Sequence, residues 1–435
     1  MLAPEKLFLL ARVSQTDGMR LPQPSALGLR KSFGFGDRLG LATPGHLAAV
    51  AKSDFAPIFA QQSVREMERT QRTPQEVLDA AQRALAAAGY EYPWGADADH
   101  HKTPEDIAKS SAAGFTFFTI DPSAFVNNEA DRLAPAELEA EIARLEDDGV
   151  LAKGWSREYL SRGFDIDARL TLEFAPEQLD RAAVKYARPL AHAAVMSEAI
   201  AKACTGRPFD VEVSIDETAT VTSPLDHLFC GLELKRRGVP VTSLAPRFIG
   251  EFEKGIDYRG DLAAFEAQLR EHVAVAKFCG PYKISIHSGS DKFSIYPAIG
   301  RACGELLHVK TAGTSYLEAL RVVARTAPAF FAEIVEFCRG RFDNDRKSYH
   351  LSTTLAQVQS LPRYAGAQDE AMFLDEVAGR QLLHVTFGSV LTAGADARGR
   401  KFKDGILEVL DRHAALHLEL LEKHFTKHLS LLRAG

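Results

Sequence analysis

Strand-like and helix-like segments alternate along this chain, and the alternation constrains its fold more than any other feature. Short runs rich in Phe, Val, Ile and Thr are typical of buried strands. Six such runs occur, namely FTFFTID (115–121), VEVSIDE (211–217), PVTSLAP (240–246), KISIHSG (283–289), LLHVKTAG (306–313) and LLHVTFGSV (382–390). Alternation with helices is typical of βαβ units and a parallel sheet, either doubly wound or closed into a (β/α)8 barrel.

Helix boundaries are readable at several points between these runs. Thr73 is the expected N-cap of one helix, Pro74 takes its first position, Glu76 completes a capping box and Gly89 ends the helix. Further helical segments are expected at 135–148, 176–204, 261–278, 315–339 and 404–432.

Polar residues gather where the strand-like runs end, at Asp121, Asp216, Glu217, His287 and His308. The C-terminal ends of the strands form the active face of a barrel, so this placement favours the barrel over the doubly wound sheet. The sequence therefore predicts a single α/β domain over residues 1–435, (β/α)8 TIM-barrel-like, with its barrel core at roughly 30–400. It carries an N-terminal elaboration and a long C-terminal helix, and we interpret residues 53–72 as an excursion from the core.

Charge and cysteine content restrict the partners and the compartment. A net charge of −6 gives no electrostatic reason to expect nucleic acid or an anionic membrane, so a small metabolite is the expected partner. Five cysteines without a C-x-x-C pair argue against a disulfide framework and a cysteine zinc site. No signal peptide is readable and no run is long enough to span a membrane. We expect a cytoplasmic protein, and a homo-oligomer is left open.

Three dense polar segments predict a metal site. They are WGADADHHKT (94–103), GPYKISIHSGSDKFSIYP (280–297) and LLHVKTAGTS (306–315). Their histidines His100, His287 and His308 could hold one divalent cation, since imidazole suits Zn, Ni, Co, Mn or Fe and catalytic sites keep a position open for substrate. The alternative is that each is a hydrogen-bonded core histidine.

Carboxylates beside these histidines are candidates for proton transfer. Asp99 directly precedes His100 and is the expected proton acceptor beside a metal-held substrate. Glu251 is the preferred partner acid, and Glu253 and Glu217 remain alternatives. Each of these acids could equally be a solvated loop residue or orient a histidine.

Other charged and glycine-rich segments are less specific. Lysines near the candidate loops would suit an anionic substrate, although a surface position is as good an explanation for half of them. The glycine spacing in residues 31–46 matches no nucleotide-binding motif but allows close backbone approach. We interpret the C-terminal histidine pairs, His413 with His417 and His424 with His428, as a solvated helix face.

Six segments together carry a family resemblance: SFGFGDRLGLATPGH, GADADHHKT, FTFFTIDPS, LAPRFIGEFEKGIDY, KISIHSGSDKFSIYP and HVKTAGTSYLEAL. They resemble the tagaturonate epimerase family, which interconverts D-tagaturonate and D-fructuronate in hexuronate catabolism. The resemblance covers most of the chain, from Ser32 to the C-terminal quarter. The resemblance implies a divalent-metal-dependent epimerase with a small hexuronate substrate. It also implies possible activity on the neutral ketohexoses fructose and tagatose, because some similar family members are used on these sugars.

The resemblance also assigns roles. It implies Asp99 as proton acceptor, Glu251 as proton donor and, as metal ligands, His100, His287 and His308, with His101 as the alternative to His100. The expected substrate-binding residues are Lys102, Glu217, Lys283, Ser288, Asp291, Lys292 and Lys310.

The inverted carbon of such a substrate is not adjacent to the ketone, which leaves two routes open. In one, a base takes a hydroxyl proton and a retro-aldol cleavage precedes recombination; in the other, a proton is removed and returned on opposite faces. A metal-dependent class II aldolase-type lyase on sugar acids is the competing function. A sugar-acid binding protein and a metal-dependent hydrolase are more distant alternatives.

Overall fold

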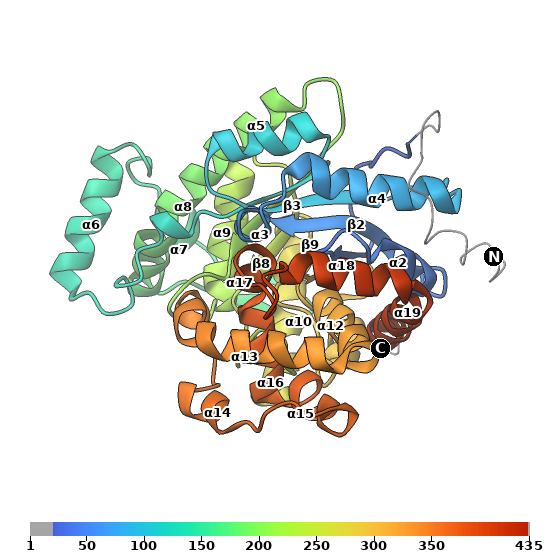
Figure 1. Cartoon of the computed structure of the whole chain (residues 1–435). Helices are drawn as coiled ribbons and strands as arrows, with labels where there is room; N and C mark the ends of the chain where they lie inside the picture. The colour runs from blue at the N-terminus through green and yellow to red at the C-terminus, as the bar shows by residue number, and fades with distance from the viewer. Residues whose placement is uncertain (1–20, 434–435) are drawn as a thin grey trace.

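A closed barrel of eight parallel strands forms the centre of the molecule (Figure 1). The computed structural model describes residues 21–433. The strands follow one another around the barrel in the order β1-β10-β9-β8-β7-β4-β3-β2, and β1 pairs with β2 to close it. Their bounds are β1 (Ser32–Gly36), β2 (Ala56–Ser63), β3 (Gly95–His101), β4 (Phe117–Ile120), β7 (Asp210–Ile215), β8 (Val241–Pro246), β9 (Lys283–Ile286) and β10 (Leu307–Thr311). The predicted (β/α)8 fold class is confirmed.

Helices surround the barrel in a ring in which each contacts the next. In ring order they are α2 (Thr43–Val50), α4 (Pro74–Ala88), α5 (Pro104–Ala113), α8 (Pro176–Ala203), α9 (Pro224–Arg236), α10 (Leu262–Cys279), α11 (Tyr296–Cys303) and α19 (Ala414–Arg433). The predicted capping box of Thr73 and Glu76 is present at the start of α4, and Gly89 ends that helix in the left-handed region. The C-terminal helix α19 closes the ring between α11 and α2.

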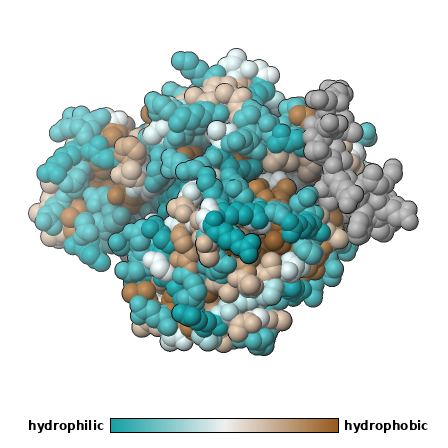
Figure 2. All heavy atoms as spheres, in the orientation of Figure 1, coloured by the Kyte–Doolittle hydropathy of each residue, from teal (hydrophilic) through white to brown (hydrophobic). Residues whose placement is uncertain are grey.

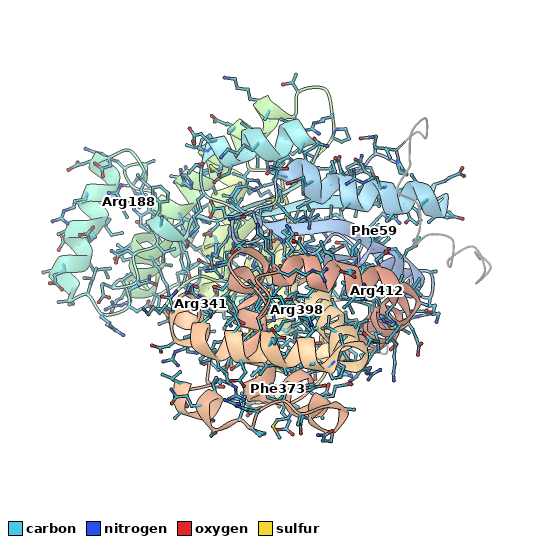
Figure 3. The ribbon with its side chains drawn as sticks, in the orientation of Figure 1. Phe59, Arg188, Arg341, Phe373, Arg398 and Arg412 are labelled. Atoms are coloured by element: carbon cyan, nitrogen blue, oxygen red, sulfur yellow. The ribbon has the colours of Figure 1, made fainter. Side chains whose placement is uncertain are left out.

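A second hydrophobic core lies among the helices that follow β10. Figure 3 shows Phe373 in this part of the molecule and Phe59 in the barrel part. The helices are α12 (Thr314–Thr326), α13 (Pro328–Asp345), η3 (Arg346–Ser348), α14 (Leu355–Ser360), η4 (Ala367–Asp369), α15 (Glu370–Leu374), α16 (Val377–Val385), α17 (Phe387–Thr392) and α18 (Phe402–Arg412). They lie together beside the barrel, and α17 packs on α3 (Val64–Thr70).

A smaller excursion leaves the barrel between β4 and β7. It contains η2 (Ser123–Phe125), α6 (Pro135–Asp147), α7 (Arg157–Leu160), β5 (Phe164–Asp167) and β6 (Leu170–Leu172). Helix α6 stands at the left edge of the molecule in Figure 1, and hydrophilic side chains predominate on the face that Figure 2 shows. None of the helices between residues 21 and 433 has the length and apolarity needed to cross a membrane. All five cysteines are free and buried.

Two predicted segments are wrong in type. Residues 382–390 were expected as a strand but form the end of α16 and most of α17, because a short apolar run is equally suited to a helix buried in the second core. Residues 53–72 were interpreted as an excursion, but residues 56–63 of that range are barrel strand β2. Strand β2 is buried on both faces, so it lacks the polar alternation that marks an exposed strand.

Two long helices are interrupted where the sequence predicted continuity. The segment 315–339 is divided between α12 and α13, because Pro328 begins a new helix. The segment 404–432 is divided at His413, between α18 and α19. The expected close approach of the N-terminal glycines is confirmed at Gly36, where a Cβ would lie 2.5 Å from the carbonyl oxygen of Thr311.

Candidate active site

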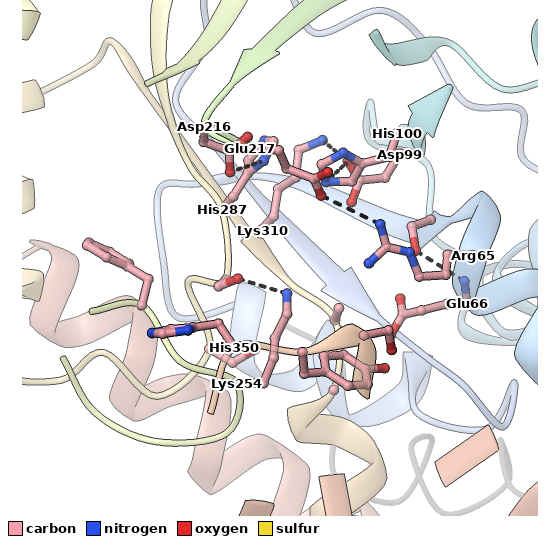
Figure 4. A pocket seen from close by; sticks show the side chains of 18 of the residues that line it. Arg65, Glu66, Asp99, His100, Asp216, Glu217, Lys254, His287, Lys310 and His350 are labelled. Atoms are coloured by element: carbon pink, nitrogen blue, oxygen red, sulfur yellow. Dashed lines mark hydrogen bonds and ion pairs between the residues drawn. The ribbon is translucent and has the colours of Figure 1, made fainter. Parts of the chain in front are cut away.

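A cavity of about 660 Å³ opens at the C-terminal ends of the barrel strands. Its wall combines the strand ends and the loops that follow them with residues 348–350 and His384 of the second core. The predicted site residues that line it are Asp99, His100, Lys102, Glu217, Glu251, His287, Ser288 and Lys310. Figure 4 shows one group on the upper side, with Lys254 and His350 below it; the group consists of Asp99, His100, Asp216, Glu217, His287 and Lys310.

Lys310 lies at the centre of a buried charge network. Its Nζ atom is 2.7 Å from Oδ1 of Asp99, 2.8 Å from Oε1 of Glu212 and 2.9 Å from Oδ2 of Asp97. Burial alone would lower the pKa of Lys310, but the three carboxylates outweigh it and raise the pKa. Asp97 and Asp99 are two apart on β3, so both side chains point into the barrel.

Asp99 is held in its ionised form. Burial would raise its pKa, but the positive charges of His100, Lys310 and His287 lower it. Nε2 of Gln61 also donates a hydrogen bond of 3.4 Å to Oδ2 of Asp99. The cavity therefore contains an anionic carboxylate that can accept a proton from a bound substrate.

His287 lies between two carboxylates. Its Nε2 atom is 2.8 Å from Oε1 of Glu212, and its Nδ1 atom is 3.1 Å from Oδ2 of Asp216. Burial lowers the pKa of His287, but Asp216 and Glu212 outweigh burial and raise the pKa to about 10. Both ring nitrogens are thus directed at acids.

His100 faces the same acidic group from the end of β3. Its Nδ1 atom is 3.4 Å from Oδ2 of Asp121, its Nε2 atom is 3.6 Å from Oδ1 of Asp99, and its ring centroid is 5.1 Å from that of His287. Burial lowers the pKa of His100, whereas Asp99 and Asp121 raise it, with a net increase. The two imidazoles and their acids form one continuous polar cluster.

Three of the predicted site residues have strained backbone. His100, Ser288 and Asp291 have φ angles of 58°, 51° and 62°, in the left-handed region that non-glycine residues rarely adopt. Such strain costs free energy and concentrates at functional sites, where the surrounding fold maintains it. Here it turns the chain at the ends of β3 and β9, where His100 and His287 lie.

The donors at the barrel mouth fit a metal ion. Two groups have ligand atoms within 4.8 Å of one another, the first formed by Asp99, Glu212 and His287 and the second by His100, Asp121 and Glu217. Lys310 already neutralises Asp99 and Glu212 in the first group. Nδ1 of His100 and Nδ1 of His287 are buried and face carboxylate oxygens of Asp121 and Asp216 at 3.4 and 3.1 Å, but neither makes a hydrogen bond among the described residues. Imidazole and carboxylate donors of this kind suit divalent transition metals.

His308 and Lys283 lie deeper in the barrel and do not line the cavity. Nδ1 of His308 is 2.9 Å from the hydroxyl of Ser32, and its Nε2 atom is 3.8 Å from Oδ2 of Asp97. Nζ of Lys283 donates a hydrogen bond of 3.0 Å to the same serine hydroxyl. The structure therefore does not bring His308 together with His100 and His287.

Lys292 and Asp291 hold the loop after β9 and also do not line the cavity. Nζ of Lys292 donates to the carbonyl oxygens of Glu253, Ile256 and Ser290 at 2.9, 2.5 and 3.1 Å. Burial lowers the pKa of Lys292 to about 7. Asp291 forms a 2.7 Å ion pair with Arg380 and lies beside two histidines of α19.

These α19 histidines correct a sequence interpretation. The C-terminal pairs were expected on a solvated face. His413 is exposed as predicted, but His417 and His428 are buried and His424 lies 3.0 Å from Asp291. Their face is turned inward because α19 closes the helical ring, where Phe425 packs against Phe33. The backbone N–H of Asp291 donates to Nε2 of His428 at 3.1 Å, so α19 anchors the loop after β9.

The alternative residues are placed as follows. Glu251 lines the cavity at a half-exposed position, with Oε2 3.0 Å from Nε2 of His350. Glu253 is buried and accepts 2.7 Å hydrogen bonds from the Ser352 backbone and the Gln381 side chain. His101 points outward to the hydroxyl of Ser110 on α5, away from the cavity.

Sequence reasoning missed two residues of the site. Lys254 lines the wall, and Glu212 bridges Lys310 and His287; neither had been a candidate. The alternation of polar residues in DVEVSID at 210–216 could have identified Glu212, because every second residue faces the barrel interior. Lys254 has no local signal of this kind, since it lies in a loop.

Comparisons with known proteins identify the family of this chain. Residues 16–432 match the family model of tagaturonate epimerase. The chain is 46% identical over 381 residues to a tagaturonate/fructuronate epimerase of Thermotoga maritima, covering 88% of this chain and 77% of the relative. A crystal structure of fructuronate-tagaturonate epimerase from Cohnella laeviribosi superposes with a TM-score of 0.88 at 38% identity, covering 94% of this chain and 83% of that one. The chain therefore belongs to the tagaturonate epimerase family and is an isomerase.

Proposed function

We propose that this protein interconverts D-tagaturonate and D-fructuronate with the help of one divalent cation. The observation that carries the proposal is the cluster at the barrel mouth, where the ionised Asp99 lies beside His100 and His287 in a cavity of about 660 Å³. A cavity of this size accommodates a six-carbon sugar acid. Family membership supplies the substrate pair.

His100 and His287 are the residues that would hold the cation, with carboxylate support from Asp121 or Asp216. When bound, the ion supplies Lewis-acid polarisation of the substrate's ketone and hydroxyl oxygens. We leave His308 out of this set because its Nε2 atom faces Asp97 inside the barrel. The same donors suit Zn, Ni, Mn, Co or Fe.

Proton transfer is assigned to two carboxylates. Asp99 accepts a proton at its carboxylate, which Lys310 keeps ionised and fixed at 2.7 Å. Glu251 is the proposed donor, since it lines the same cavity and contacts His350 at the rim. Both the retro-aldol route and the two-face proton route use Asp99 as the first base.

An assay with metal-stripped protein tests the proposal. D-tagaturonate is incubated in deuterated water with and without added Mn, Ni, Co or Zn, and products are followed by nuclear magnetic resonance. We expect fructuronate only when metal is present. Deuterium at the inverted carbon would favour the two-face proton route, whereas its absence would favour the retro-aldol route.

The same spectra separate the epimerase from the competing lyase. Accumulating three-carbon fragments would indicate an aldolase-type lyase, and fructuronate formation without any metal would remove the cation from the proposal. Unchanged substrate under all conditions would contradict the epimerase assignment. The free, buried cysteines support a reducing compartment, and we place the enzyme in the cytoplasm.

A further inference from the structure

Most positive side chains of the cavity wall are already paired with an acid. The wall contains six lysine or arginine residues. Lys310 contacts three carboxylates, Arg38 contacts Glu66 at 2.6 Å, Lys102 contacts Asp121 at 3.3 Å and Arg65 contacts Glu217 at 3.6 Å. These four cations are therefore unsuited to act as the main partner of an anionic substrate group.

The two remaining positive side chains, Arg247 and Lys254, differ in their hydrogen-bond partners. Arg247 ties two loops together, because its guanidinium donates to the carbonyl of Thr218 and its backbone N–H donates to the Thr222 hydroxyl at 2.9 Å. Nζ of Lys254 has one hydrogen bond, of 2.8 Å, to the hydroxyl of Ser288. Within residues 21–433, no carboxylate lies within salt-bridge distance of Lys254.

The position of Lys254 directs it at the catalytic side of the cavity. Ser288 follows His287 in the chain, and Figure 4 shows Lys254 reaching from below toward the cluster that contains His287 and Lys310. Burial and the nearby charge of Arg38 lower the pKa of Lys254, and together they outweigh Glu66 and Asp99, which raise it. An anionic group bound at Nζ would compensate both effects.

The backbone that carries Lys254 is held from three sides. Lys292 donates to the carbonyl oxygens of Glu253 and Ile256. Arg380 donates to the carbonyl of Gly255 at 2.6 Å, and Gln381 donates to the carbonyl of Lys254 itself at 3.4 Å. Because the backbone at Lys254 is already ordered, binding a ligand there costs little further conformational entropy of the loop.

We propose that Lys254 binds the carboxylate of the hexuronate and gives the enzyme its preference for uronates over neutral ketohexoses. This inference rests on the proposed function of the same cavity. The ammonium group exchanges its hydroxyl partner Ser288 for the substrate carboxylate, which forms the stronger, charge-assisted hydrogen bond. A neutral ketohexose carries a hydroxymethyl group at that end and gains no such bond.

The test compares D-tagaturonate with D-tagatose in wild type, Lys254→Gln and Lys254→Arg, with the exposed Lys277→Gln as control. For Lys254→Gln we expect kcat/KM on tagaturonate to fall by about 10- to 100-fold, through KM, while tagatose changes less than about threefold. Lys254→Arg should restore part of the loss, and Lys277→Gln should behave as wild type. If the wild-type enzyme does not turn over tagatose, the inhibition constant of tagatose, measured against tagaturonate turnover, replaces kcat/KM for this sugar.

Equal losses on both sugars, or no loss on tagaturonate, would overturn the role of Lys254. If Arg247→Gln loses the uronate preference and Lys254→Gln keeps it, the substrate carboxylate binds Arg247 instead. Calorimetric titration with tagaturonate separates this inference from the proposed function, because it does not need turnover. Binding that depends on Lys254 without conversion would reject the epimerase activity but keep the carboxylate site, and absence of binding would reject both.

Discussion

Two groups of buried histidines in this molecule have opposite ionisation. At the barrel mouth, burial opposes the charge of His287, yet Asp216 and Glu212 raise its pKa to about 10. Between α2 and α19, burial prevails, and the pKa values of His46 and His417 fall to about 3 and 4.

The difference lies in the acids that face each ring. His287 has a carboxylate oxygen within 3.1 Å of each ring nitrogen. His46 instead contacts the hydroxyl of Ser315 and stacks on Phe35, and Nε2 of His417 has no hydrogen-bond partner among the described residues. Burial is shared by both groups, so it does not by itself distinguish a functional histidine from a packing one.

The largest expected effect concerns the base at the mouth. Asp99→Asn should lower kcat by about 10²- to 10⁴-fold, because the amide cannot accept the proton, while the fold is retained. Turnover of tagaturonate and circular dichroism would measure the two properties. The matched change Asp79→Asn on α4 should leave kcat unchanged. A kcat near that of wild type in Asp99→Asn would transfer the role of base to another residue.

Removing the ammonium group of Lys310 from the barrel mouth should destabilise the fold. Lys310→Met leaves Asp97, Asp99 and Glu212 buried without their ammonium partner, and the free energy of unfolding should fall by about 3–5 kcal/mol. Lys283→Met is the matched control. It removes an equally buried lysine that pairs with no acid, so we expect a loss of about 1–2 kcal/mol in urea denaturation. Similar losses in both variants would contradict the charge network as the cause.

From the buried histidines of α19 we predict that the free energy of unfolding falls in acid. Because the folded pKa of His417, about 4, is below its unfolded value, the unfolded chain takes up the proton first and stability falls as pH drops from about 6.5 to about 4. This residue should contribute about 2 kcal/mol of that loss between pH 7 and 5. His417→Leu should flatten the acid limb of a stability curve measured by denaturant titration, and an unchanged slope would show that His417 is not buried neutral.

In metal-free protein, His287 should change the pH dependence of stability in the opposite direction. Its folded pKa of about 10 lies above the unfolded value, so its contribution is complete below about pH 6.5 and is lost as pH rises toward 10. His287→Gln should remove this alkaline loss and leave the acid limb intact. A wild-type curve that stays flat up to pH 10 would contradict the paired carboxylates as its cause.

The smallest effect is expected at the rim of the cavity. The Lys102 side chain is 45% exposed and pairs with Asp121 at 3.3 Å, so solvent screens its charge. Lys102→Ala should change kcat/KM for tagaturonate by less than about fivefold, corresponding to less than about 1 kcal/mol. A loss as large as that expected for Lys254→Gln would place the substrate carboxylate at the rim.

Sequence reasoning was reliable where local pattern decides structure. Alternating segments predicted the barrel, and the capping box at Thr73 predicted the start of α4. It failed at 382–390 and 56–63, because these short buried segments have no residue period that separates helix from strand. Residues expected at strand ends, such as Asp99, His100 and His287, line one cavity because a barrel brings all such ends to one face.

The sequence by itself therefore determined the fold class, the family and the barrel face on which the cavity lies. The tertiary structure decided which charged groups are free to act. Lys292 is committed to backbone carbonyls and Lys310 to acids from other strands, whereas among residues 21–433 Lys254 is paired with a hydroxyl only. The physical reason is that a pKa or an ion pair depends on neighbours through space, and these neighbours come from strands far apart in the chain.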